Sequence, residues 1–227
     1  PDPLRATPAP PPVLFVHGEP AAMARHGVAV VGTRRCTGYG VAVTQHLAAS
    51  LAAAGVTVVS GLARGIDTAS HTAAAEQGCT VAVLGHGLGR TFPKANERLR
   101  ERIVATGGAV VSTFPDATRP TRFTFPIRNQ WIAGLSEAVV VVEAPSRSGA
   151  LITAEAAALH RRELAAVAAV RHPHVVHVFD GGDEPAPWLV MERARGTLGG
   201  VGSWSALRRA LDELLAGLGA VHAAGVL

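Results

Sequence analysis

The feature that most constrains the fold is a unit that occurs four times: a short Val-rich segment, a glycine-containing loop, and a stretch with helical spacing. The first unit runs from VAVVG at residues 28–32 into GVAVTQHLAASLAAAG, and the others begin at VTVVSG, VAVLGHG and AVVVVEA. Continuous apolar strands are typical of parallel strands covered by helices on both faces. The alternation therefore predicts an α/β fold with a Rossmann-like, doubly wound, mostly parallel sheet.

Shorter segments complete this prediction. AVVSTF adds a strand between the third and fourth units, VLFVHG predicts a strand that ends at Gly18, and NQWIAGLS predicts the start of a helix. Gly55 stands where a glycine ends the helix of the first unit. Residues 1–12 are proline-rich and are expected to be extended, without helix.

The loops that follow the strands carry arginine side chains. Right-handed crossovers bring these loops to one edge of the sheet, where such folds bind ligands. Helix N-termini and guanidinium groups both favour phosphate, so this edge is predicted to bind an anion. The arginines are Arg34 and Arg35 on the first loop, Arg64 on the second, Arg90 on the third and Arg147 on the fourth.

The glycine spacing argues against a nucleotide cofactor. Gly32, Gly38 and Gly40 do not fit the dinucleotide fingerprint, GHGLG is a near miss, and the P-loop pattern is absent. We expect no cofactor and no metal. The net charge of +4 instead suits a polyanion.

A second cluster, RPTRFTFPIRNQW at residues 119–131, interleaves arginines with aromatic residues in a chain that is only 4% aromatic. Single-stranded nucleic acid needs cations for its backbone and ring faces for its bases. Two interpretations stay open: a stacking surface, or Phe125 and Trp131 as core residues that anchor a loop.

Candidates for catalysis have simpler explanations. Asp67 lies four residues before His71 and suits an N-cap, while Glu143, like Glu155, could be a general base or could order a loop. No paired-carboxylate or Ser–His–Asp set stands out, so no catalytic residue is predicted. Cys36 and Cys79 suit reduced thiols in the cytoplasm.

The ends of the chain and its hydropathy add two expectations. No apolar run approaches the ~18 residues that span a bilayer, and no signal peptide is recognised. The chain begins with Pro rather than Met, which suggests a fragment.

Over residues 10–158 the segments VAVVGTRRCTGYG, VVSGLARGIDTASH, TVAVLGHGLGRTFPKAN and FPIRNQWIAGLSEAVVVVEAPSRSGALITAEAA resemble the DNA-processing protein A (DprA/Smf) family. The resemblance implies binding of single-stranded DNA and loading of a RecA-type recombinase in natural transformation, without catalysis. It places the nucleic-acid-binding residues at Gly32, Thr33, Arg34, Arg35, Gly61, Arg64, Gly65, Arg122, Phe125, Arg128, Asn129, Ser148 and Gly149.

The chain also departs from the family pattern. Thr33 stands where serine is usual, Trp131 replaces an aliphatic residue, and the strand ending in V-P-G with the segment after it is missing. Because that segment carries the family's dimer surface, a homodimer stays an open alternative. Residues 160–227 resemble part of a bacterial serine/threonine kinase, with Glu163 at the αC glutamate but without catalytic motifs. ELAAVAAV could be that helix or the last parallel strand, and its alanines favour helix.

These observations predict a proline-rich lead-in at 1–12, a Rossmann-like domain at 13–159 and a partial kinase-like α+β segment at 160–227. The predicted function is binding of single-stranded DNA. Two alternatives stay open: a Rossmann-like enzyme that binds nucleotides or hydrolyses nucleoside monophosphates, and a kinase-derived interaction module.

Overall fold

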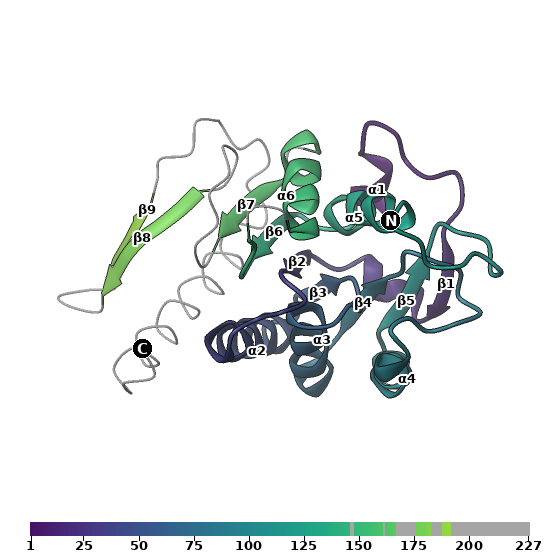
Figure 1. The fold of residues 1–227 in the computed structure, drawn as a ribbon, viewed down its shortest axis with the longest axis horizontal. Coiled ribbons are helices and arrows are strands. Elements are labelled where there is room, and N and C mark those ends of the chain that lie inside the picture. Colours follow the sequence, from purple (N-terminus) through teal and green to yellow (C-terminus); the bar gives the residue numbers. More distant parts are fainter. Residues whose placement is uncertain (146–147, 161, 167–175, 183–187, 192–227) are drawn as a thin grey trace.

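A mixed β-sheet organises the chain (Figure 1). The computed structural model describes residues 1–145, 148–160, 162–166, 176–182 and 188–191. In this part the strand order is β1-β5-β4-β3-β2-β6-β7-β8-β9, with β1 and β9 antiparallel to their neighbours and the other pairs parallel. The strands are β1 Phe15–Gly18, β2 Gly27–Val31, β3 Thr57–Ser60, β4 Thr80–Val83, β5 Ala109–Ser112, β6 Ala138–Val141, β7 Glu163–Ala166, β8 Val176–Gly182 and β9 Trp188–Met191.

Helices cover both faces of the sheet. Figure 1 shows α2, α3 and α4 on one side, and α5 and α6 on the other. The predicted doubly wound, mostly parallel α/β fold is therefore confirmed. The α-helices are α1 Asp2–Arg5, α2 Gly38–Ala53, α3 Ile66–Gln77, α4 Glu97–Ala105, α5 Thr124–Gly134 and α6 Gly149–Leu159, with 3₁₀ turns η1 Pro20–Met23 and η2 Lys94–Asn96.

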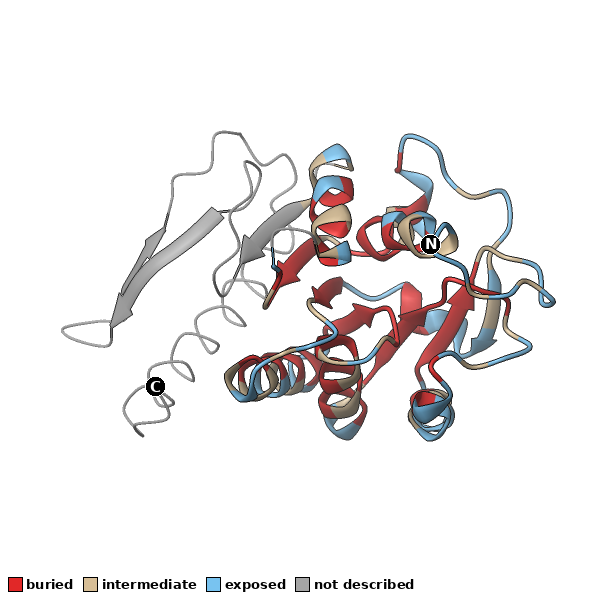
Figure 2. Cartoon of the chain, viewed as in Figure 1, coloured by how far each residue is buried: buried red, intermediate tan, exposed pale blue. Residues whose placement is uncertain are grey.

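The continuous apolar strands feed a core on each face. In β2, Val28 and Val30 pack with α2 and α3, while Ala29 and Val31 pack with residues of α5 and α6. Every residue of β2 to β6 is buried, which Figure 2 shows as continuous red strands. This two-sided burial is the reason that the strands lack polar alternation.

The strand order reverses at β2, which lies between β3 and β6. Val28 pairs with Val58 on one side and with Ala138 on the other. A crevice at the carboxyl ends of such strands is the usual ligand site of doubly wound folds. The loops after β2 and β6 therefore flank the position where a nucleotide would be expected.

Two local predictions were wrong. Residues 1–12 include the short helix α1, which accepts Pro3 in its first turn and buries Leu4. Helix α5 begins at Thr124, before the predicted NQWIAGLS segment. Gly55 was placed correctly, since it follows α2 with a φ of +80°.

The kinase-like interpretation of residues 160–227 is not supported. Glu163–Ala166 form β7, which pairs in parallel with β6, so the start of ELAAVAAV is strand and not the αC helix. Here the pairing with β6 overrides the helical preference of alanine. The predicted kinase elements at residues 167–175 and 192–227 lie outside the described residues.

Candidate nucleic-acid interface

The loops after β2, β3, β4 and β6 meet at the carboxyl edge of the sheet, as predicted. The N–H of Thr33 donates to the Glu143 carbonyl at 2.7 Å, and the N–H of Ile66 donates to the Thr33 carbonyl at 3.3 Å. Asn96 donates its Nδ2 to the Leu62 carbonyl at 2.9 Å, which joins the second and third loops. These bonds hold the loops together as one surface.

The N-terminus of α2 already binds a carboxylate of the chain itself. Glu143, which follows β6, accepts a hydrogen bond from the Thr37 N–H at 3.0 Å and a short one from the Thr37 hydroxyl. A Cβ on Gly40 would lie 2.5 Å from the Glu143 carboxyl carbon, so only glycine allows this approach. Of the two roles considered for Glu143, general base or loop-ordering residue, this geometry favours the second. The carboxylate occupies the helix N-terminus, where a nucleotide phosphate would otherwise bind.

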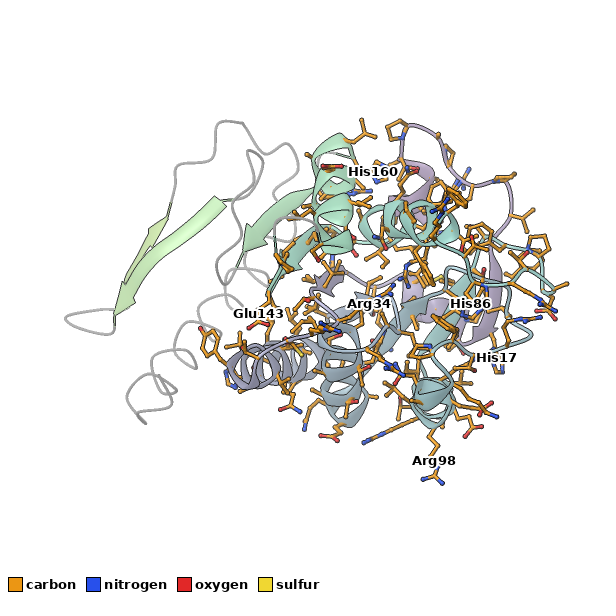
Figure 3. The ribbon with its side chains drawn as sticks, viewed as in Figure 1. His17, Arg34, His86, Arg98, Glu143 and His160 are labelled. Carbon is orange, nitrogen blue, oxygen red and sulfur yellow. The ribbon has the colours of Figure 1, made fainter. Side chains whose placement is uncertain are left out.

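Arg34 and Arg35 are exposed on the first loop. The Arg35 N–H donates to the Thr33 hydroxyl at 3.2 Å, so the threonine in place of the family's serine still orders the turn. The Arg34 guanidinium lies over the Phe125 ring, 5.2 Å from its centroid. Figure 3 shows Arg34 near the middle of the described part, whereas Arg98 projects away from α4.

The second cluster reaches the same edge through α5. Arg122 is exposed, and its guanidinium lies 4.7 Å from the centroid of the Phe123 ring, which is 66% exposed. Phe125 is half-buried, and Trp131 packs partly buried against the core. Trp131 is therefore an anchor, while Phe123 and Arg122 remain available at the surface.

Arg128 differs from the prediction because it is buried, with 4% of its surface exposed. Its Nη1 donates to the Val83 carbonyl at 2.6 Å and, through a short bond, to the Gly61 carbonyl. Burial lowers the Arg128 pKa to about 10, although attraction to Asp67 opposes the shift. The side chain therefore joins the ends of β3 and β4 from inside rather than meeting a phosphate at the surface.

Asn129 and the start of α6 are also positioning elements. Asn129 is buried, accepts from Arg128 Nε at 3.1 Å, and donates to the Gly149 carbonyl at 2.9 Å. The Ser148 hydroxyl accepts from the Ala150 N–H at 3.3 Å and caps α6. These bonds fix the fourth loop relative to α5.

Asp67 and His71 are both buried in α3. Asp67 is not the N-cap, which is Gly65; its carboxylate accepts from the Ala63 N–H at 3.2 Å, and burial raises its pKa. Burial lowers the His71 pKa to about 3, and His71 Nδ1 lies 2.8 Å from the Thr80 hydroxyl. A neutral, buried His71 fits a structural role.

The remaining loop arginines have no described contact with Arg34. Arg64 and Arg90 are exposed at their loops. Arg147 lies outside the described residues. Within the described part of the chain, only Arg34 and Arg122 combine exposure with a position over an aromatic ring.

Sequence reasoning missed the third loop as an organised element. Arg100, from α4, donates to the carbonyls of Leu88 at 2.7 Å and Arg90 at 2.9 Å, and to the Thr91 hydroxyl at 3.1 Å. Phe92 follows directly, is 46% exposed, and has its ring centroid 6.0 Å from that of Phe125. The Phe-Pro pair beside a glycine loop was the available signal.

Gly65 is expected to be essential for the position of the first loop. Its φ is +77°, and a Cβ would lie 2.9 Å from the Arg34 carbonyl carbon. Gly65→Ala should lower the free energy of unfolding by about 1–3 kcal/mol, measured by urea denaturation. Gly38→Ala is the control, because a Cβ on Gly38 would have no neighbouring atom within 4 Å. It should change stability by less than about 0.5 kcal/mol. Equal effects of the two variants would contradict this prediction.

The described residues contain neither a membrane-spanning helix nor a cluster of metal-ligating side chains. No helix in this part is long and apolar enough to cross a membrane. No group of three or more His, Cys, Asp or Glu side chains there could hold a metal ion. Cys36, half-buried, and Cys79, buried, are both free thiols.

Comparisons with known proteins agree on one family. The family model described as DNA recombination-mediator protein A matches residues 1–181. Protein Smf of Escherichia coli (strain K12) is 42% identical over 195 residues, which is 86% of this chain and 50% of Smf. This chain thus spans about half the length of that relative.

Solved structures show the same fold. The X-ray structure of DNA processing protein A from Streptococcus pneumoniae superposes with a TM-score of 0.69 at 39% identity, covering 77% of this chain and 61% of that one. A structure of DNA processing protein A from Helicobacter pylori, reported for its single-stranded DNA binding mode, gives a TM-score of 0.68 at 28% identity, covering 73% and 76%.

Proposed function

Because this chain belongs to the DNA recombination-mediator protein A family, we propose that it binds single-stranded DNA at the carboxyl edge of its sheet. The observation that carries the proposal is the pair of exposed guanidiniums over aromatic rings, Arg34 over Phe125 and Arg122 over Phe123. Cations of this kind meet phosphates, and neighbouring rings meet bases. The named H. pylori relative, reported for its single-stranded DNA binding mode, supports this choice.

The predicted binding residues divide into two roles under this proposal. Arg34, Arg35 and Arg122 contact the DNA backbone, with Arg64 as a further cation at the second loop. The others shape the loops that present them. These shaping residues are Gly32, Thr33, Gly61, Gly65, Phe125, Arg128, Asn129, Ser148 and Gly149.

The proposed role is not catalytic. The Glu143 carboxylate is bonded to Thr37, and a substrate phosphate at the N-terminus of α2 would have to displace it. Incubation with AMP should release no adenine, as followed by chromatography. Release that Glu155→Gln abolishes would favour the alternative of nucleoside-monophosphate hydrolysis.

The proposed cellular role is to deliver the bound strand to a RecA-type recombinase in the cytoplasm during natural transformation. The family description as a recombination mediator supports it. A strand-exchange assay with single-stranded DNA coated by a single-strand-binding protein would test it: the chain should shorten the lag before the recombinase assembles. A homodimer stays a separate proposal, which sedimentation would test.

Binding itself is tested by titrating a labelled oligo-dT and a duplex of equal length at several salt concentrations. We expect preference for the single strand and weaker binding as salt rises, because counterions are released on binding. Equal affinity for the two DNAs would overturn the proposal.

A further inference from the structure

Phe125 is already surrounded in this structure. The Arg34 and Arg128 guanidiniums lie over its ring, with Cζ 5.2 and 5.8 Å from the centroid. A Cβ on Gly85 would lie 2.7 Å from Phe125 Cδ1, so the ring also packs against the backbone of the third loop. Because Arg128 is buried and held by backbone carbonyls, and Arg34 lies over the same ring, a base that stacked on Phe125 would compete with these guanidiniums.

Phe92 offers the ring surface that Phe125 lacks. Its side chain is 46% exposed, and its ring is tilted by 32° to that of Phe125 at a centroid separation of 6.0 Å. No guanidinium of the described residues lies over the Phe92 ring. Since Phe92 and Arg34 both lie beside Phe125, the uncovered ring and the exposed cation are neighbours of the same residue.

The loop that carries Phe92 is fixed before any ligand arrives. Arg100 donates hydrogen bonds to it at three positions, Leu88, Arg90 and Thr91. Pro93, the next residue, is buried, and Asn96 bonds to the second loop at Leu62 and to Thr68 of α3. A ring on an ordered loop loses little conformational freedom when a base stacks on it.

We propose that Phe92 is a base-stacking residue, on which one base of the single strand lies while Arg34 contacts the phosphate beside it. Phe125 acts as the support that holds Arg34 in place. This inference rests on the proposed function, because it requires single-stranded DNA at this edge. It assigns the apolar contact to the third loop, whereas the aromatic residues that the sequence analysis singled out lie in residues 119–131.

The test separates the bases from the backbone. Wild type, Phe92→Leu and Phe92→Trp are titrated with oligo-dT and with an abasic oligonucleotide of the same length and charge. Wild type should prefer oligo-dT, Phe92→Leu should bind oligo-dT about tenfold more weakly with little change for the abasic strand, and Phe92→Trp should retain the preference. Leu159→Ala is the control, because Leu159 is 65% exposed at the C-terminal end of α6 and its truncation removes similar apolar surface.

Fluorescence provides a second measurement that does not depend on the leucine variant. Oligo-dT should quench the added tryptophan of Phe92→Trp, beyond the change in wild type, and the abasic strand should not. This inference would be overturned, while the proposed function stands, if Phe92→Leu kept the wild-type ratio of affinities for oligo-dT and the abasic strand. Absence of added quenching in Phe92→Trp would overturn it as well. Failure of wild type to bind oligo-dT would instead overturn the proposed function, and this inference with it.

Discussion

Arg128→Met is expected to lower the free energy of unfolding by about 3–5 kcal/mol, the largest effect of any substitution at this edge. The methionine leaves the Gly61 and Val83 carbonyls without their buried donor. It also removes the cation whose charge opposes the raised pKa of buried Asp67. Urea denaturation near neutral pH measures the loss.

The pH dependence of this loss identifies Asp67 as its partner. Without Arg128 the Asp67 pKa should rise further, so the folded state binds a proton at a pH where the unfolded state does not. Stability is then gained as pH falls, and the gap between variant and wild type should be smaller at about pH 5 than at about pH 8. Asp67→Asn in the same chain should recover part of the loss at the higher pH.

Arg98→Met is the matched control for Arg128. Arg98 is exposed on α4 and projects into solvent (Figure 3), so its loss should cost less than about 0.5 kcal/mol. A cost below about 1 kcal/mol for Arg128→Met would show that the buried guanidinium does not hold the loops together.

Arg34→Ala combined with Arg122→Ala is expected to weaken binding of oligo-dT by on the order of a hundredfold at moderate salt. Each exposed guanidinium lies over an aromatic ring, Arg34 over Phe125 and Arg122 over Phe123, and the proposed function has both contact phosphates. Since each phosphate contact contributes about 0.7 to the salt slope for a single strand, the slope should fall by about 1.4. Fluorescence anisotropy across a salt series measures both quantities.

The control for the Arg34 and Arg122 double variant removes two positive charges from another part of the surface. Arg5 and Arg25 are exposed near the opposite edge, in α1 and just before β2. Their double alanine variant should keep most of the affinity, because the Debye length of ~10 Å screens distant charges at about 0.1 M salt. An equal loss in both double variants would point to bulk charge rather than to these two residues.

Much of the fold could be predicted because β2 to β6 are buried on both faces and therefore carry a continuous apolar pattern. Glycines and short loops marked the limits of the units, and Gly55 lies where expected. The prediction failed at α1, where Leu4 finds a buried place on α5 that no local pattern encodes. It failed again at β7, because strand pairing with β6 outweighs the preference of alanine.

The sequence predicted that the loops after the strands meet at one edge of the sheet, but not how deeply each loop or helix residue is buried. The sequence predicted that the arginines lie at one edge of the sheet. It did not predict which of them are exposed, as Arg34 is, and which are buried, as Arg128 is. Only the packing of α5 against the ends of β3 and β4 separates them. Phe92 was not predicted because the ring beside it, Phe125, lies on another segment of the chain. Arg100 was not predicted because its bonds to Leu88, Arg90 and Thr91 depend on the conformation of the loop before α4.

The Glu143 carboxylate, bonded to Thr37, occupies the position at the N-terminus of α2 that a small anion would need. Glu143 follows β6 and Thr37 caps α2, so the carboxylate closes the point where the strand order reverses. To bind there, a free mononucleotide would have to displace the Glu143 carboxylate from Thr37, and it would gain only one phosphate contact in return. Under the proposed function, a long strand would contact the tips of several loops and leave that bond intact. The Glu143–Thr37 bond would then favour a polynucleotide over a free mononucleotide at this edge.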